Sequence, residues 1–134
     1  MAKSEKQKLK LLYIIQCLME KTDEEHAVTT QEIIDYLALQ GITAERKSIY
    51  TDIDLLIDFG MDIIKKPGRS GGYTLASRQF ELAELKLLVD AVQSSKFITT
   101  KKSRELIGKL ETLCSKYEAT QLHRQVVVTN RNKA

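Results

Sequence analysis

The sequence predicts a mainly α-helical protein that carries one small β-hairpin. Apolar residues recur every three to four positions in five segments, as on the buried face of an amphipathic helix, at residues 4–21, 29–40, 44–59, 80–95 and 100–116. One stretch, 62–75, instead places β-prone runs on both sides of a glycine- and proline-rich turn. With 134 residues and 43% hydrophobic content, the chain can bury about 65–70% of its unfolded surface. That is enough for one compact domain, or for a domain of about 80 residues with an appendage.

The first two helices have clear sequence boundaries. The helix at 4–21 carries lysines at its start and an apolar stripe of Leu11, Ile14, Ile15 and Leu18. The second helix opens on Thr29-Thr30-Gln31-Glu32, which matches a capping box: a threonine hydroxyl accepts from a free amide while Glu32 reaches back. Gly41 follows as its C-cap. Both helices should turn one face to a common core.

The third helix is expected over residues 44–59, with Thr43 as its N-cap and Gly60 closing it. A helical period of 3.6 residues places Ile49, Ile53, Leu56 and Phe59 toward a core. The same period turns Lys47, Thr51 and Asp54 outward, with Ser48 and Tyr50 on the flanks. Asp52 lies partly toward the core, so we expect it to make a structural hydrogen bond.

A basic hairpin follows the third helix. Residues 62–78 contain Lys65, Lys66, Arg69 and Arg78 against the single acid Asp62, a local net charge of +3. The turn Pro67-Gly68-Arg69-Ser70-Gly71-Gly72 is basic and glycine-rich, and Tyr73 beyond it is expected to be a packing residue. Three helices followed by such a hairpin form the winged helix-turn-helix arrangement, which we assign to residues 1–78, with the wing at 62–75.

The second half returns to helix. Helices at 80–95 and 100–116, joined by a short connection, predict an antiparallel helical pair. We therefore assign residues 79–122 to a helical linker that also dimerises. Residues 125–129, Gln-Val-Val-Val-Thr, favour a short terminal strand. A lone strand needs a partner, so residues 123–134 are expected to begin a missing C-terminal domain.

Composition excludes several classes of protein. No apolar run approaches the roughly 20 residues of a membrane span, and the N-terminus does not read as a secretory signal. Cys17 and Cys114 make neither a disulfide framework nor a zinc cluster, and we expect both to be buried, inert thiols. A cytoplasmic location is the simplest expectation. The net charge of +3 is too mild to identify a nucleic-acid partner by itself.

Several segments resemble one family of bacterial regulators. Residues 45–56, Glu-Arg-Lys-Ser-Ile-Tyr-Thr-Asp-Ile-Asp-Leu-Leu, resemble the recognition helix of DeoR-like winged helix-turn-helix repressors. Residues 72–75, 80–92, 95–98, 102–103 and 122–126 are similar to the group whose members carry a C-terminal WYL domain. The resemblance implies a bacterial transcription regulator whose WYL sensor, the part that would bind an effector, lies outside this chain. The family often has Arg where this sequence has Thr51, so one phosphate or base contact that the resemblance implies is absent here.

The expected partner is a double-stranded DNA operator, with the third helix in the major groove and the wing on the backbone or in the minor groove. Lys47, Ser48 and Thr51 would point toward bases, and Arg46 and Tyr50 toward phosphates. Exposed groups of Thr30 and Gln31, at the start of the second helix, would bind phosphate. The wing would contribute Lys65, Lys66 and Arg69. Because winged regulators commonly read two half-sites, we expect a homodimer.

An enzymatic function has little support in the sequence. The glycine-rich turn lacks the Gly-Lys-Ser/Thr ending of a phosphate-binding P-loop, and no catalytic or metal-ligand spacing stands out, so no cofactor, metal or catalytic residue is expected. Two alternatives remain open. The chain could be the winged-helix module of a bifunctional enzyme, as in biotin ligase–repressors, or a winged helix that binds protein. Steep salt dependence would distinguish a DNA binder from a protein-interaction module.

Overall fold

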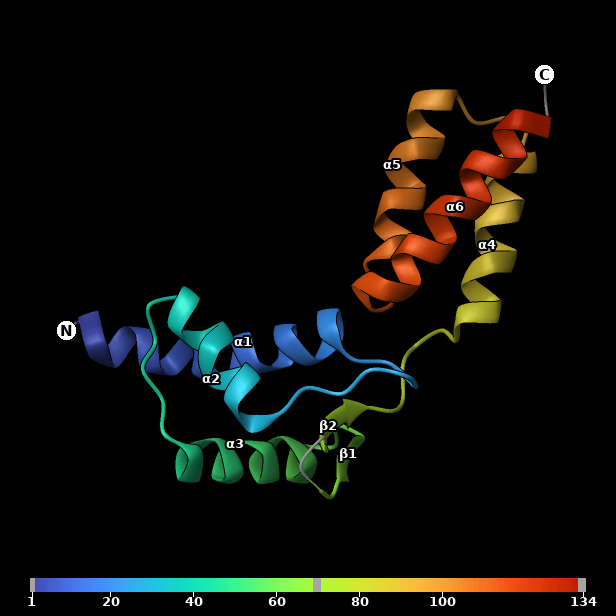
Figure 1. Ribbon diagram of the computed structural model, residues 1–134. Helices are drawn as coiled ribbons and strands as arrows, with labels where there is room; N and C mark the ends of the chain where they lie inside the picture. The colour runs from blue at the N-terminus through green and yellow to red at the C-terminus, as the bar shows by residue number, and fades with distance from the viewer. Residues whose placement is uncertain (1, 69–70, 133–134) are drawn as a thin grey trace. The chain divides into compact units, whose positions relative to one another are not determined.

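The computed structural model describes the backbone of residues 2–68 and 71–132 and the side chains of residues 5–68 and 71–126. Its elements, in chain order, are α1 (Ala2–Lys21), α2 (Thr30–Leu39), α3 (Arg46–Phe59), β1 (Ile63–Lys66), β2 (Gly72–Leu75), α4 (Leu82–Ser94), α5 (Thr100–Glu111) and α6 (Lys116–Asn132) (Figure 1). They divide into two compact units, Met1–Ser77 and Arg78–Ala134. The first unit has the predicted winged-helix order of three helices and a hairpin.

The core of the first unit lies between its three helices and the hairpin. Its buried apolar side chains include Ile14, Leu18, Ile33, Leu37, Ile49 and Ile53, all without exposed surface. The same cluster takes Ile63, Tyr73 and Leu75 from the hairpin. Each helix contributes its apolar stripe, which leaves the opposite face of α3 exposed to solvent. The fold therefore presents one face of α3 next to the hairpin.

The starts of α2 and α3 show one confirmed boundary and one correction. The predicted capping box is present: Glu32 N donates to Thr29 Oγ1 at 3.1 Å, and Thr29 N donates to Glu32 Oε1 at 3.1 Å. Helix α3, however, begins at Arg46 with Glu45 as its N-cap, so Thr43 is not the cap. Ile42 is buried and its amide donates to Leu37 O. Burying Ile42 keeps the connection non-helical for two residues more than expected.

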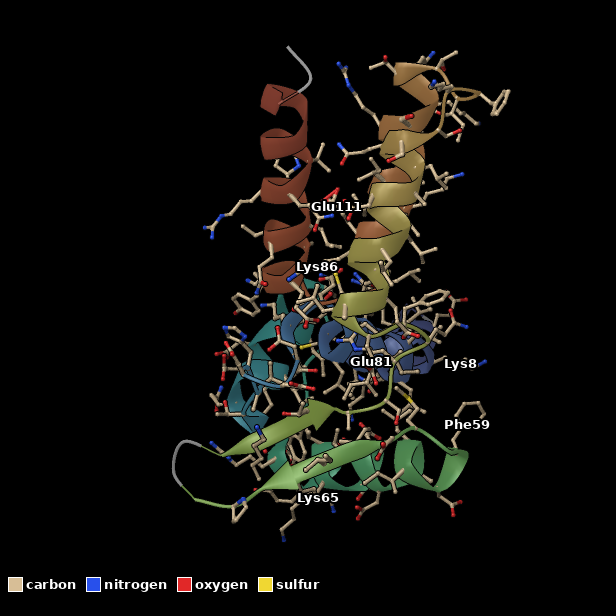
Figure 2. All side chains as sticks on the ribbon, turned by 90° about the vertical axis from the view of Figure 1, so that its right-hand side faces the viewer. Lys8, Phe59, Lys65, Glu81, Lys86 and Glu111 are labelled. Atoms are coloured by element: carbon tan, nitrogen blue, oxygen red, sulfur yellow. The ribbon has the colours of Figure 1, made fainter. Side chains whose placement is uncertain are left out.

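Phe59 is not a core residue, contrary to the sequence expectation. Its side chain is 82% exposed, whereas Leu56, one turn earlier, is buried. The helix ends at Gly60, where φ is +121°, and the amide of Met61 donates to Leu56 O. This turn brings Met61 back against the core. In Figure 2 the Phe59 side chain lies at the end of α3, turned away from the helix.

The hairpin is attached to the segment that precedes α2. Strands β1 and β2 pair antiparallel, with Ile63 opposite Leu75 and Lys66 opposite Gly72. Beyond this ladder, Val28 N donates to Tyr73 O at 3.0 Å and Tyr73 N donates to Val28 O at 2.7 Å. The two bonds hold the wing beside the start of α2, so the position of the hairpin does not depend on its own short ladder alone.

The second unit contains three helices, and its third helix overturns the predicted terminal strand. Helices α4, α5 and α6 lie side by side (Figure 1) around a cluster that includes Leu85, Val89 and Leu122. Residues 125–129 lie inside α6. Leu122 is fully buried and Val126, four residues later, packs on the same cluster. Residues four apart thus face the same cluster, as on a helix. The valines favour a strand by propensity, but that propensity depends largely on the packing around them.

The boundary between α5 and α6 also differs from the sequence expectation. Helix α5 ends at Glu111, and Ser115 opens α6 by accepting from Glu118 N through Oγ at 3.1 Å. The predicted helix 100–116 therefore ends five residues early, and a turn separates it from α6. Because residues 125–129 form no strand, the lone-strand argument for a missing domain no longer applies. That domain stays a prediction based on the family resemblance. Among the helices described, none is both long and apolar enough to cross a membrane.

Candidate nucleic-acid interface

An open groove of about 530 Å³ lies in the first unit between the start of α2, the start of α3 and the wing. Its lining is Thr29, Thr30, Gln31, Arg46, Tyr50, Lys65, Lys66, Pro67, Gly68, Gly71, Gly72 and Tyr73. Three of these side chains are cationic and none is anionic. The groove is therefore a positively charged cleft built from three separate segments of the chain.

The groove brings together six of the ten residues that the sequence nominated for DNA contact: Thr30, Gln31, Arg46, Tyr50, Lys65 and Lys66. Lys47 and Thr51 do not line it; they are exposed on α3 outside the groove. Ser48 neither lines the groove nor lies on the exposed face with Lys47 and Thr51, because it packs against α1. Arg69 lies outside the described residues, in the turn between Gly68 and Gly71.

The floor of the groove is held by Tyr73. Its ring is buried and its hydroxyl lies 3.3 Å from Thr30 Oγ1. Gly72, next to it, has φ of +151°, and a Cβ there would lie 2.2 Å from Val28 O. Only glycine permits so close an approach of two backbones. The sequence expectation that Tyr73 is a packing residue is confirmed, and its hydroxyl also fixes the position of Thr30.

The first turn of α3 is electrostatically unusual. Its N-cap, Glu45, makes no side-chain hydrogen bond to the helix, and the turn holds Arg46 and Lys47 but no acid. The partial positive charge at a helix N-terminus favours anions there and disfavours cations. In α2, by contrast, the capping box satisfies these amides and places Glu32 in the first turn. The start of α3 therefore carries two cations beside the carboxylate of Glu45, and no side chain caps its first amides.

The outward face of α3 presents short polar side chains beside a lysine. Lys47 and Thr51 are both exposed. Thr51 Oγ1 donates to Lys47 O at 3.1 Å, so its hydroxyl hydrogen is used within the helix and its oxygen still can accept. The Lys47 ammonium can donate up to three hydrogen bonds. This pair can contact base edges or phosphates without rearranging the core.

Ser48 differs from its neighbours because it packs against α1. Its Oγ accepts from Lys10 Nζ, and the same ammonium forms an ion pair with Asp52 Oδ2 at 2.7 Å. The side chains of Lys10 and Asp52 are 10% and 15% exposed. Asp52 therefore has a structural role, as expected, but through an ion pair and not through the expected hydrogen bond. Ser48 serves the same α1–α3 contact and does not join Lys47 and Thr51.

Lys10 is the residue that sequence reasoning missed. The lysines at the start of α1 were given no individual role from the sequence, and Lys10 among them is buried. A signal was available, because Lys10 precedes the core residue Ile14 by four positions and so lies on the apolar face. Its charge is compensated by the carboxylate of Asp52, as a buried ammonium requires. Lys10 thereby fixes α3 against α1 from the side opposite the groove lining.

A second ion pair joins α3 to the wing. Lys65 Nζ on β1 donates to Asp54 Oδ1 on α3 at 2.7 Å, and both side chains are more than half exposed (Figure 2 labels Lys65). The hydrogen bond with Asp54 raises the pKa of Lys65, so the amine stays protonated at neutral pH. Asp54 thus partly neutralises one of the cations that line the groove.

The described residues do not form a cluster of metal-ligating side chains. No group of three or more His, Cys, Asp or Glu side chains within them could hold a metal ion. Cys17 and Cys114 are buried free thiols, as expected. His26 Nδ1 lies 2.8 Å from Asp23 Oδ1, which closes the connection between α1 and α2. These side chains account for local structure, away from the groove lining.

Comparison with known proteins gives one match. Residues 12–68 match the family described as FokI, D3 domain, a DNA-binding winged-helix-like domain. No curated protein and no solved structure matches the chain. The matched stretch covers less than half of the chain and runs from α1 through α2, α3 and β1 into the turn of the wing. It therefore includes most of the groove and the whole outward face of α3.

Proposed function

We propose that the chain is a sequence-specific double-stranded DNA-binding module of a transcription regulator. The observation that carries this proposal is the groove, in which Arg46, Lys65 and Lys66 converge beside the exposed face of α3. A duplex needs both of these features. Phosphate contacts position a protein on DNA, and side chains that reach base edges supply specificity.

In the proposed complex α3 enters the major groove by its N-terminal half. Lys47 and Thr51 then face base edges, and Lys47 can donate to guanine O6 and N7. Arg46 and Tyr50, with Thr30 and Gln31 at the start of α2, face the phosphates of one strand. Lys65 and Lys66 reach the neighbouring backbone or minor groove, as does Arg69, whose position is not described.

The electrostatics of α3 support this arrangement. A first turn with two cations and no side-chain cap costs stability in the free protein. Violations of local sequence rules concentrate at functional sites. A DNA phosphate near Arg46 could accept from the amides that no side chain caps. The acids Asp54 and Asp58, further along the outward face, favour a complex in which the second half of α3 leaves the groove.

The family match supports the same partner, because the matched domain is DNA-binding and winged-helix-like. The resemblance to DeoR-like regulators with a WYL domain supports the finer part of the proposal. On that basis the protein is a cytoplasmic, non-enzymatic bacterial regulator that works as a homodimer and responds to an effector bound outside residues 1–122. No cofactor is assigned to it.

Selection from random duplex DNA, followed by affinity measurement over a range of salt concentrations, tests the proposal. We expect one enriched sequence and a log–log salt dependence whose slope is about −0.9 per phosphate contact. Lys47→Ala should weaken binding to the selected sequence by about 1–3 kcal/mol and relax preference at the base it contacts. Lys66→Gln should instead weaken all sequences alike and reduce the slope by about 1.

Lys8→Ala is the matched control, because Lys8 is an exposed lysine of the same unit on α1, outside the groove (Figure 2). It should leave both selectivity and slope unchanged. Equal losses for Lys8→Ala and Lys47→Ala would contradict the assignment of α3 to the major groove. Binding without salt dependence, or no duplex binding, would favour a protein-interaction winged helix.

A further inference from the structure

The ion pair between Asp54 and Lys65 lies on the surface that the proposed DNA complex uses. Lys65 lines the groove, and its ammonium is 2.7 Å from the Asp54 carboxylate. Asp54 belongs to the outward face of α3, as do Lys47 and Thr51 nearer the N-terminus. The pair therefore connects the two elements that contact DNA, at the edge where α3 and β1 meet.

We propose that Asp54 is an affinity-limiting residue, which holds Lys65 in an internal ion pair and so weakens the binding of any DNA duplex. The inference rests on the proposed DNA-binding function. On any duplex, a phosphate that takes Lys65 must displace the Asp54 carboxylate. The uncompensated carboxylate then repels the neighbouring phosphates.

This cost is the same for every duplex, because displacing Asp54 from Lys65 does not depend on the base sequence. Base contacts by Lys47 and Thr51 add affinity only on the right sequence, whereas non-cognate binding depends almost entirely on phosphate contacts. Asp54 therefore lowers cognate and non-cognate affinities by the same factor and leaves their ratio unchanged.

Asp58 provides a matched comparison on the same helix. It lies one turn beyond Asp54, is exposed, and forms no ion pair among the described residues. Neutralising either aspartate changes the net charge by the same amount. Only neutralising Asp54 releases Lys65. A difference between the two variants therefore reports the ion pair and not the overall charge.

The test measures affinity of the full chain for the selected duplex and for a scrambled duplex, with wild type, Asp54→Asn, Asp58→Asn, Lys65→Gln and the double variant Asp54→Asn/Lys65→Gln. Because exposed ion pairs are weak, we expect Asp54→Asn to tighten scrambled-duplex binding about two- to fivefold beyond the effect of Asp58→Asn. The selected duplex should gain by the same factor, so the affinity ratio stays unchanged. The salt slope should steepen by up to about 0.9, because Lys65 then binds phosphate without breaking an internal pair.

The double variant isolates the coupling. With Lys65 replaced by glutamine, Asp54→Asn should give only the change seen for Asp58→Asn. The inference would be overturned if Asp54→Asn and Asp58→Asn changed DNA affinity equally. It would also be overturned if Asp54→Asn raised DNA affinity as much in the Lys65→Gln background as in the wild type. Neither result would contradict DNA binding itself. Absence of salt-dependent duplex binding by the wild type would overturn the proposed function itself. Coincident thermal unfolding curves confirm that these exposed substitutions leave the fold unchanged.

Discussion

At the scale of single residues, a largely buried ion pair fixes the position of α3. Lys10 bridges Ser48 and Asp52, so α3 is held to α1 by polar as well as apolar contacts. Removing one member of such a buried pair leaves the other charge uncompensated, which is far more costly than losing an exposed pair. Two of the three aspartates of α3 thus have different roles: Asp52 fixes the helix and Asp54 contacts the wing.

Cys17 should make the stability of the first unit sensitive to alkaline pH. Burial raises the pKa of its thiol from 9.0 to about 11. Between these values the unfolded chain loses a proton that the folded chain keeps, so the free energy of unfolding falls as pH rises. The loss approaches about 2–3 kcal/mol by pH 11. Urea unfolding at a series of pH values measures it.

Cys17→Ala is the control for this prediction. It should be less stable at pH 7, because it leaves a cavity, but its stability should fall less steeply between pH 9 and 10. Burial and the nearby Glu20 raise the pKa of Tyr36 to about 12, so a second decline above pH 10 should persist in the variant. Parallel curves for both proteins from pH 9 to 10 would contradict the assignment to Cys17.

At the scale of elements, the wing depends on one glycine for its attachment. Gly72→Ala should detach β2 from Val28, because the new Cβ would overlap Val28 O and φ is positive there. We expect a destabilisation of about 1–3 kcal/mol. Hydrogen exchange of the Val28 and Tyr73 amides should accelerate, and DNA affinity should fall as the groove widens.

Gly108→Ala is the control for the wing prediction. Gly108 lies inside α5, where a Cβ meets no atom within 4 Å. Alanine there should stabilise the helix by about 0.5–1 kcal/mol. If Gly72→Ala were equally tolerated, the attachment of β2 to Val28 would not determine where the wing lies.

The elements also show where sequence patterns are informative. Two helix ends were predictable: the start of α2, with its capping box of Thr29 and Glu32, and the end of α3 at Gly60. The interactions that form each of these ends join residues close in sequence. The start of α3 was not, since it depends on burying Ile42 against the rest of the core. Residues 125–129 have strand propensity but form a helix, because α4 and α5 supply the apolar surface that α6 covers.

At the scale of the whole molecule, two separate hydrophobic clusters predict two independent unfolding reactions. Ile53 and Leu85 are fully buried, one in each cluster. Ile53→Ala should lower the stability of residues 1–77 by about 2–5 kcal/mol, and Leu85→Ala should do the same for residues 78–132. Hydrogen exchange measured segment by segment reports both units in one experiment.

The two variants control each other. Each substitution should leave amide protection in the other unit unchanged, because distant sites without shared partners are additive. Faster exchange throughout the chain after either substitution would show that the two units unfold as one cooperative structure.

The sequence alone determined the order of elements in the first unit, the cap of α2, the basic character of the wing and the outward position of Lys47 and Thr51. All of these follow from local periodicity, turn chemistry or charge along the chain. Tertiary structure alone decided that Arg46, Lys65 and Lys66 share a groove with the start of α2, that Lys10 is buried, and that Asp54 holds Lys65. These depend on contacts between residues distant in sequence, whose geometry is set only when the helices and the hairpin pack on a common core.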